Sequence, residues 1–198
     1  TILIERHKAA IKRSELSRPV RIALTAKLFT EGTTFFDYGC GCGTDVKRIK
    51  EQGFTSSGWD PYYQPNAAIE PADIVNLGYI INIIEDIEER REALTKAWEL
   101  TRQVLIVSAQ ILVDDRRRGL MAYGDGVVTN PNTFQKYYEQ EELKSYIDQV
   151  IGVDSIPVGL GIYFVFRDEI QAESFRAFRL YSPTSLPQVP AKDKSWSP

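Results

Sequence analysis

Nine residues near the N-terminus have the types and spacing of a loop that holds a nucleotide-like cofactor. Residues 35–43 read Phe-Phe-Asp-Tyr-Gly-Cys-Gly-Cys-Gly, so an apolar segment ends in an acid and three glycines then alternate with other residues. Glycine lacks a Cβ and accepts positive φ, which lets the backbone approach a ligand closely. Asp60 ends a second apolar stretch, where a carboxylate can accept hydrogen bonds from ribose hydroxyls. The pattern therefore predicts a strand, a glycine turn and a helix that together hold a nucleoside.

The glycine spacing favours one class of cofactor. Dinucleotide sites usually carry G-x-G-x-x-G and bind a pyrophosphate at a helix N-terminus. Here the order is Asp37-x-Gly39-x-Gly41-x-Gly43, which resembles motif I of class I S-adenosylmethionine (SAM) methyltransferases. The resemblance implies SAM as cofactor and S-adenosylhomocysteine as its product. The alternative is a glycine turn in an α/β protein that binds nothing.

Composition limits the remaining possibilities. The chain has 198 residues, of which 43% are hydrophobic and 26% charged, as expected for one globular domain with a sizeable core. Its net charge of −3 argues against nucleic-acid binding by the chain as a whole. No apolar run approaches the length of a membrane span. The only cysteines, Cys40 and Cys42, are too close for a disulfide and too few for a zinc site, so we expect no metal and a cytoplasmic location.

The hydrophobic pattern predicts a Rossmann-like α/β fold, with a mostly parallel sheet and helices on both faces. Two strands that follow each other as closely as 153–157 and 161–166 must pair antiparallel, which finishes the sheet at its C-terminal end. Between Asp60 and Asp73 there is little room for a third βα unit, so we expect that side of the cofactor pocket to be short. The other predicted strands are 34–38, 54–59, a strand that begins at Asp73, and 103–109, and the helices are 44–52, 86–101 and 139–150.

Three regions are expected along the chain. Residues 1–30 read as a basic helical extension, because segment 1–28 carries seven Lys or Arg and two Glu, a net charge of +5 without His7. Ser17 and Pro19 are a helix start after a break. Residues 31–178 form the SAM-binding domain. Residues 179–198 read as a Pro/Ser-rich linker or tail, which suggests a further C-terminal domain in a longer protein.

Longer segments resemble the DNA phosphorothioation-associated methyltransferases of bacteria, over about residues 5–170. The resemblance implies a class I methyltransferase domain in a DNA-modification or defence context, and it identifies no substrate. The segments that carry it are Glu5–Pro19, Phe36–Gly41, Gly58–Tyr63, Asp73–Tyr79, and Tyr123–Gly126 with Thr133–Tyr138.

The predicted cofactor-binding residues lie at the ends of three strands, where ligands gather in open α/β sheets. The loop is expected to form the floor, with an acid and an aromatic beside the methionine end. The set comprises Asp37, Tyr38, Gly39, Cys40, Gly41 and Gly43 in the loop, Asp60, Pro61 and Tyr62 for ribose and adenine, and Asn76, Leu77 and Gly78 at the third strand end. DNA amino-methyltransferases carry Asp/Asn-Pro-Pro and an aromatic there. The absent prolines argue against ordinary adenine or cytosine N-methylation.

Catalytic and acceptor-binding candidates follow from the chemistry of methyl transfer. In-line displacement from a sulfonium depends mainly on positioning, and a base matters when the acceptor is a hydroxyl. His7 is the only histidine, and it is either a base over the pocket or a solvated helix residue. Tyr79, Lys136 and Tyr137 are the other catalytic candidates, and Arg13, Tyr123, Asp125 and Phe134 are the acceptor-binding candidates.

Several of these candidates have a structural alternative. Residues 110–132 are polar and contain glycines, so they read as a long functional loop that forms a lid over the acceptor. Tyr137 and Phe134 are equally explained as core anchors. The basic N-terminal helix and Arg116–Arg118 can contact a phosphate backbone or form a solvated face.

The sequence therefore predicts a SAM-dependent methyltransferase that acts on a nucleic acid or a nucleotide-like acceptor. A small metabolite is the alternative acceptor. A second alternative is a SAM-binding sensor or scaffold without catalysis, which the short third unit would suit. A dinucleotide-binding oxidoreductase is disfavoured by the glycine spacing.

Overall fold

The computed structural model describes residues 2–113, 120–129 and 132–181. The chain divides into two compact units, Thr1–Arg167 and Asp168–Pro198. Every strand among the described residues lies in the first unit, and the described part of the second contains one helix, α5 (Glu169–Tyr181). The boundary expected at residue 178 falls within α5. None of the described helices is both long and apolar enough to cross a membrane.

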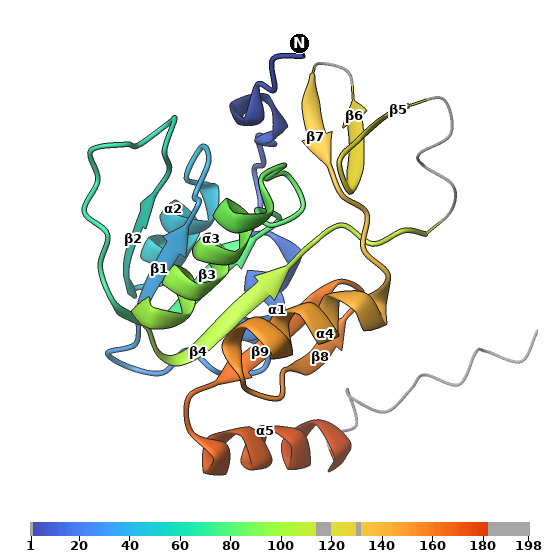
Figure 1. Ribbon diagram of the computed structural model, residues 1–198. Helices are drawn as coiled ribbons and strands as arrows, with labels where there is room; N and C mark the ends of the chain where they lie inside the picture. The colour runs from blue at the N-terminus through green and yellow to red at the C-terminus, as the bar shows by residue number, and fades with distance from the viewer. Residues whose placement is uncertain (1, 114–119, 130–131, 182–198) are drawn as a thin grey trace, which may run out of the picture. The chain divides into compact units, whose positions relative to one another are not determined.

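A six-stranded sheet forms the centre of the first unit (Figure 1). Its order is β2-β1-β3-β4-β9-β8, with β2, β1, β3 and β4 parallel and β9 and β8 antiparallel. The strands are β1 (Thr34–Tyr38), β2 (Thr55–Trp59), β3 (Ala72–Gly78), β4 (Thr101–Ser108), β8 (Ile156–Gly159) and β9 (Ile162–Phe166). This confirms the predicted α/β fold class and the predicted antiparallel pairing of the last two strands.

Helices cover both faces of the sheet, with α3 and α4 on one face and α1 and α2 on the other (Figure 1). They are α1 (Arg18–Thr25), α2 (Thr44–Glu51), α3 (Ile87–Leu100) and α4 (Gln140–Ile151). Capping residues in the sequence set the first residues of these helices. Asp86 caps α3 by accepting a hydrogen bond from the Glu89 backbone N–H, and Glu139 and Glu142 form a capping box on α4. Ser17 and Pro19 begin α1, as predicted.

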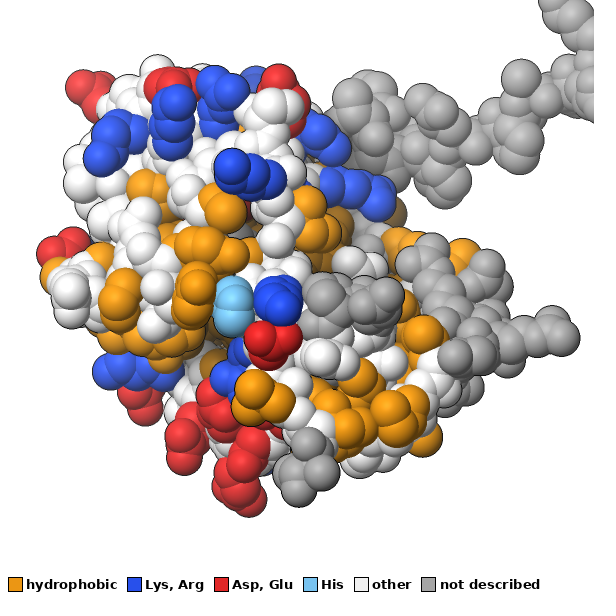
Figure 2. All heavy atoms as spheres, turned by 90° about the horizontal axis from the view of Figure 1, so that it is seen from above, with side chains coloured by type: hydrophobic (Ala, Val, Ile, Leu, Met, Phe, Trp, Pro, Cys, Tyr) orange, Lys and Arg blue, Asp and Glu red, His pale blue; other side chains and the backbone are white. Residues whose placement is uncertain are grey.

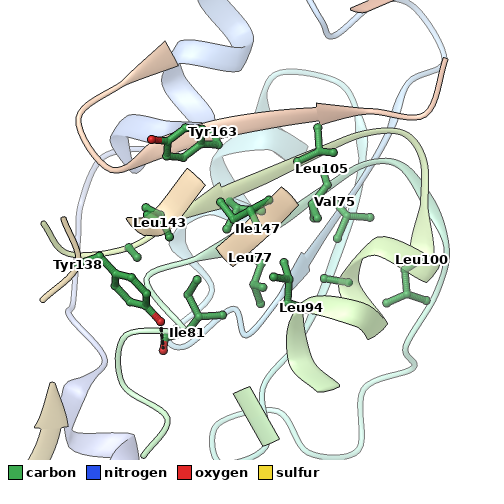
Figure 3. Close-up of a cluster of buried hydrophobic side chains, with 14 of the residues drawn as sticks. Val75, Leu77, Ile81, Leu94, Leu100, Leu105, Tyr138, Leu143, Ile147 and Tyr163 are labelled. Atoms are coloured by element: carbon green, nitrogen blue, oxygen red, sulfur yellow. Dashed lines mark hydrogen bonds between the residues drawn. The ribbon is translucent and has the colours of Figure 1, made fainter. Parts of the chain in front are cut away.

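The main core lies between the sheet and helices α3 and α4 (Figure 3). Side chains alternate along a strand, so every second residue of the central strands points into this layer. Val75 and Leu77 of β3 pack there with Leu94 of α3 and Ile147 of α4, all fully buried. The Tyr138 hydroxyl donates a hydrogen bond to the Ile81 carbonyl at 3.4 Å, which satisfies a polar group inside the core.

The sheet ends early on the β2 side. Residues 61–71 connect β2 directly to β3, and the described chain has no helix there, so β2 is an edge strand. The expected shortage of a third βα unit is therefore confirmed. The side chain of Trp59 turns toward this connection, where its indole N–H donates to the Pro65 carbonyl at 3.3 Å.

The stretch predicted as a long loop instead contains strands of a second sheet, here called the small sheet. The prediction of an irregular loop was therefore wrong. Strands β5 (Met121–Tyr123), β6 (Gly126–Thr129) and β7 (Thr133–Gln135) pair antiparallel. These strands are three or four residues long, too short for a periodic signal. Phe134 is buried, and a Cβ on Gly126 would lie 2.6 Å from its ring. The predicted charge run Arg116–Arg118 lies outside the described residues.

The N-terminal segment is not one basic helix. A single 3-10 turn, η1 (Arg6–Ala9), is followed by non-helical chain up to α1. Backbone groups in this stretch bind other elements instead, as the hydrogen bond from the Glu5 N–H to the Asn132 carbonyl shows. Most of the predicted C-terminal linker, residues 182–198, lies outside the described part of the chain, and its nature stays a prediction.

Candidate functional site

The C-terminal ends of β1, β2 and β3 open into a cleft of about 1160 Å³. Parallel strands direct their carboxyl ends to one edge, so residues that follow separate strands meet there. The strand register places Asp37 of β1 beside both Gly58 of β2 and Asn76 of β3. The cleft is lined by the glycine turn after β1, by residues 59–63 after β2 and by residues 78–80 after β3.

The glycine turn takes the backbone conformation that its sequence predicts. Gly39, Gly41 and Gly43 have φ values of 93°, 54° and 85°, a region that residues with a Cβ rarely adopt. At Gly39 a side chain is also excluded by space, because a Cβ would lie 2.6 Å from Ile80 Cδ1. The Gly39 and Cys40 N–H groups both donate to the Trp59 carbonyl, which fixes the turn against β2.

Asp60 organises the loops on both sides of the cleft. Its Oδ2 accepts a hydrogen bond from the Gly41 N–H at 3.0 Å, and its Oδ1 accepts from the N–H groups of Tyr62 and Tyr63, each at 2.9 Å. A carboxylate offers about four lone-pair sites, so these bonds leave capacity for a ligand hydroxyl. The sequence predicted Asp60 as a ribose-binding residue and missed its contacts with the protein backbone.

Asp37 is a buried acid at the floor of the cleft. Its Oδ1 accepts a hydrogen bond from the Asn76 amide at 3.0 Å. Burial, followed by the charge of Asp45, raises the pKa of Asp37 to about 8. The Asn76 hydrogen bond lowers this pKa, and the charge of Asp60 raises it by a smaller amount. Asn76 is 2% exposed, and its Oδ1 has no hydrogen-bond partner among the described residues.

Asp45 is a third carboxylate beside the turn, and sequence reasoning missed it. It lies in the first turn of α2 and accepts hydrogen bonds from the backbone N–H and the hydroxyl of Ser17, at 2.7 and 2.6 Å. The only sequence signal is an acid two residues after the last glycine, which is also a common helix-start residue. These bonds hold the N-terminal segment against the glycine turn.

Residues 3–11, here called the strap, lie across the cleft. The His7 ring stacks on Tyr62 with centroids 3.9 Å apart and planes at 12°, and the Tyr63 hydroxyl donates to the His7 carbonyl at 3.2 Å. On the other side, Arg6 forms ion pairs with Glu85 and Glu89. The strap therefore connects the loop after β2 to the start of α3.

Tyr79 directly follows the last residue of β3 and lines the cleft. It has a φ of 57°, a strained conformation for a residue with a side chain, and its N–H donates to the Ser108 carbonyl at 3.0 Å. The Arg13 guanidinium lies 5.6 Å from the centre of its ring. Burial raises the pKa of the Tyr79 phenol, which keeps the group protonated at neutral pH.

The structure brings most of the predicted site residues to this one cleft. Its lining includes Asp37, Tyr38, Gly39, Cys40, Gly41, Gly43, Asp60, Pro61, Tyr62, Asn76 and Gly78 from the cofactor set, with His7, Arg13 and Tyr79. Leu77 does not line it, because the alternation along β3 turns its side chain into the core, where it is fully buried. Whether these residues bind a cofactor stays a prediction.

The catalytic and acceptor-binding candidates in and directly after the small sheet lie outside the cleft. Lys136, Tyr137, Tyr123, Asp125 and Phe134 do not line the cleft. Buried Arg90 donates to both carboxylate oxygens of Asp125, at 2.7 and 3.0 Å, and lowers the pKa of that acid. Lys136 packs over the Tyr138 ring at 4.8 Å. Asp125 and Lys136 therefore anchor the small sheet, and buried Phe134 fits the core-anchor alternative.

Comparisons with known proteins agree on the fold. No family model matches the chain, and no curated protein matches it significantly. Solved structures do match, at low identity. The Burkholderia thailandensis 1,6-didemethyltoxoflavin-N1-methyltransferase, with bound S-adenosylhomocysteine, has a TM-score of 0.53 and 11% identity over 76% of each chain. Streptomyces venezuelae DesVI has a TM-score of 0.53 and 14% identity over 74% of this chain and 90% of that one.

A third similar structure is the magnesium protoporphyrin IX methyltransferase ChlM from Synechocystis PCC 6803, also with bound S-adenosylhomocysteine. It has a TM-score of 0.52 and 13% identity over 83% of this chain and 94% of that one. The comparisons lend no support to the resemblance to DNA phosphorothioation-associated methyltransferases. They show that the chain has the Rossmann-like fold of class I SAM-dependent methyltransferases.

Proposed function

We propose that the chain binds SAM in the cleft between the glycine turn, Asp60 and Asn76, and transfers its methyl group to an acceptor. The observation that carries this proposal is the set of acidic side chains around the glycine turn. Asp45 and Asp60 place two carboxylates beside a turn that in dinucleotide enzymes would face a pyrophosphate, and such an arrangement repels a phosphate and attracts a cation. Buried Asp37, with a pKa raised to about 8, adds a third carboxyl group, whose ionised form a bound cation would favour.

SAM matches these charges. It carries a sulfonium and an ammonium group, one carboxylate and no phosphate. The free Oδ1 of buried Asn76 can accept a hydrogen bond from the ammonium group, beside the Asp37 carboxyl. Arg13, which has no ion-pair partner among the described residues, is available to the carboxylate of the methionine moiety. Asp60 keeps one acceptor position for ribose.

Positioning dominates the proposed transfer. The acceptor must approach the methyl group in line with the carbon–sulfur bond, so the walls near Tyr79 select its orientation. Tyr79 is held by the Ser108 carbonyl and by Arg13, which limits its movement. His7 also lines the cleft and is the candidate base for a hydroxyl acceptor.

The proposal also names the class of molecule that accepts the methyl group. We place it among nucleic acids or nucleotide-like molecules, in the DNA-modification context that the sequence resemblance implies. A small metabolite is the second candidate, and it is favoured by the structural neighbours, whose names include 1,6-didemethyltoxoflavin and magnesium protoporphyrin IX as methylated compounds. A SAM sensor without catalysis is a third, because the missing third βα unit shortens the wall beside β2.

Calorimetric titration with SAM, S-adenosylhomocysteine and NAD tests the cofactor assignment. The matched variants are Asp60→Asn and Asp73→Asn. Both carboxylates accept hydrogen bonds from backbone N–H groups. Asp73, near the start of β3, accepts its bond from Thr34 of β1, and Asp73 does not line the cleft. We expect micromolar SAM binding that is weakened only by Asp60→Asn. Binding of NAD without SAM, or equal losses in both variants, would contradict the proposal.

A further inference from the structure

The surface that adjoins the cleft on the α2 side carries a concentration of positive charge. Segments 12–21 and 44–51 together hold seven Lys or Arg and three Asp or Glu, a net charge of +4 in a chain whose net charge is −3. We call this surface the basic rim. The six of its cations that have no ion-pair partner among the described residues are Lys12, Arg13, Arg18, Arg21, Lys47 and Lys50, all exposed.

Hydrogen bonds join the two segments into one surface. The Thr44 hydroxyl donates to the Arg13 carbonyl at 2.9 Å, and the Arg48 guanidinium donates to the Ser14 carbonyl at 2.6 and 2.9 Å. Ser17 binds Asp45 on the same side. The cations therefore project from a fixed backbone, and Arg13 brings the rim to the cleft itself.

The opposite wall of the cleft has the opposite charge. The charged residues of α3 that line it are four acids and two cations, a net charge of −2: Glu88, Glu89, Glu92 and Glu99, with Arg91 and Lys96. In the view from above, a row of Lys and Arg side chains lies along the upper part of the face with Asp and Glu at its margin, and a group of Asp and Glu side chains lies at the lower edge (Figure 2). A polyanion would be attracted to one side of the cleft only, which would fix the direction of its approach.

The cleft has room and aromatic surface for a base beside the cofactor. Its volume of about 1160 Å³ exceeds the roughly 300–1,000 Å³ of sites for one small ligand. The Tyr79 ring, with Arg13 at 5.6 Å from its centre, is a stacking platform of the kind that single-stranded nucleic acids use. A base inside a duplex could not reach Tyr79 without leaving its stack.

We propose that the basic rim binds the phosphate backbone of a single-stranded nucleic acid and directs one of its bases into the cleft over Tyr79. The inference rests on the proposed function for the methyl donor and assigns the acceptor class. An anionic membrane is the competing polyanion. The rim lacks what membrane-surface helices carry, because none of the strongly exposed large apolar side chains belongs to segments 12–21 and 44–51.

Fluorescence anisotropy with labelled single strands of about 12 nucleotides, DNA and RNA, tests the proposal at salt between about 50 and 200 mM. The rim variant is Lys12→Gln/Lys47→Gln. The control variant, Lys27→Gln/Arg102→Gln, removes the same charge from exposed positions outside the rim. None of these four residues lines the cleft, so calorimetry with SAM is expected to give the same affinity for all three proteins.

The wild-type and control proteins are expected to bind the single strands equally. The rim variant should bind at least about tenfold more weakly at low salt, and its log–log salt dependence should be shallower by about 1.4, since each of the two lost phosphate contacts contributes about 0.7. Equal losses in both variants, tighter binding of duplex, or binding only to phosphatidylserine vesicles would overturn the assignment. If SAM binding fails while rim-dependent strand binding persists, the proposed function fails and the surface assignment stands.

Discussion

Replacing Asp37 by Asn should make the protein more stable at alkaline pH. Because burial and the neighbouring acids raise the folded-state pKa of Asp37 to about 8, while an unfolded aspartate titrates near 4, folding takes up a proton between these values. Within that window, wild-type stability should fall by about 1.4 kcal/mol per pH unit as pH rises. Asn carries no such proton, so the variant lacks this part of the slope.

The local geometry accommodates the replacement. Asp37 accepts a hydrogen bond from the Asn76 amide, and the side-chain oxygen of the substituted asparagine would accept the same bond. The new amide N–H would face the Oδ1 of Asn76, which has no partner among the described residues. The variant should therefore match wild type near pH 4 and exceed its free energy of unfolding by several kcal/mol near pH 8.

Urea unfolding of both proteins at intervals between about pH 4 and pH 9 measures this difference. Titrating groups distant from Asp37 contribute equally to the two curves, so the difference between the curves reports Asp37 together with its acidic neighbours Asp45 and Asp60. Parallel curves over the whole range, or a variant less stable than wild type near pH 8, would refute the argument that a buried, protonated Asp37 lies at the cleft floor.

Three further predictions concern the same structure. SAM should bind more tightly as pH rises toward about 8, by up to about tenfold per pH unit, because its positive charge favours ionised Asp37; calorimetry that finds pH-independent affinity would contradict this. Gly39→Ala should cost about 1–3 kcal/mol more in thermal unfolding than Gly32→Ala, since both glycines have positive φ but only the first Cβ would meet Ile80. Arg90→Met should cost about 2 kcal/mol and speed proteolysis of the small sheet, because buried Arg90 binds Asp125 and the Ile84 carbonyl; exposed Arg91→Met is the control, and equal effects would argue against the anchor.

The parts of the fold that local sequence signals determine could be predicted. Glycines at every second position after an apolar strand fix the turn at Gly39, Gly41 and Gly43, and the short spacing before Gly161 forces the antiparallel pairing of β8 and β9. The short interval between Asp60 and Asp73 correctly excluded a helix there.

The parts that depend on long-range contacts could not be predicted. The small sheet is held by the pairing of Arg90 with Asp125, 35 residues apart, and its strands are too short for a periodic pattern. The Ser17–Asp45 contact and the stacking of His7 on Tyr62 have no signal in either local segment. The sequence also did not indicate that Lys136, a catalytic candidate, lies outside the cleft lining, because polar residues of a structural contact and of a site are of the same types.

A crystal structure of the protein soaked with S-adenosylhomocysteine tests the central claim most directly. We expect the ribose hydroxyls at the Asp60 carboxylate and the ammonium group of the homocysteine moiety at Asn76 and Asp37, under the strap. A ligand at another position, or an empty cleft at saturating concentration in crystals that leave the cleft open to solvent, would contradict the proposed cofactor site.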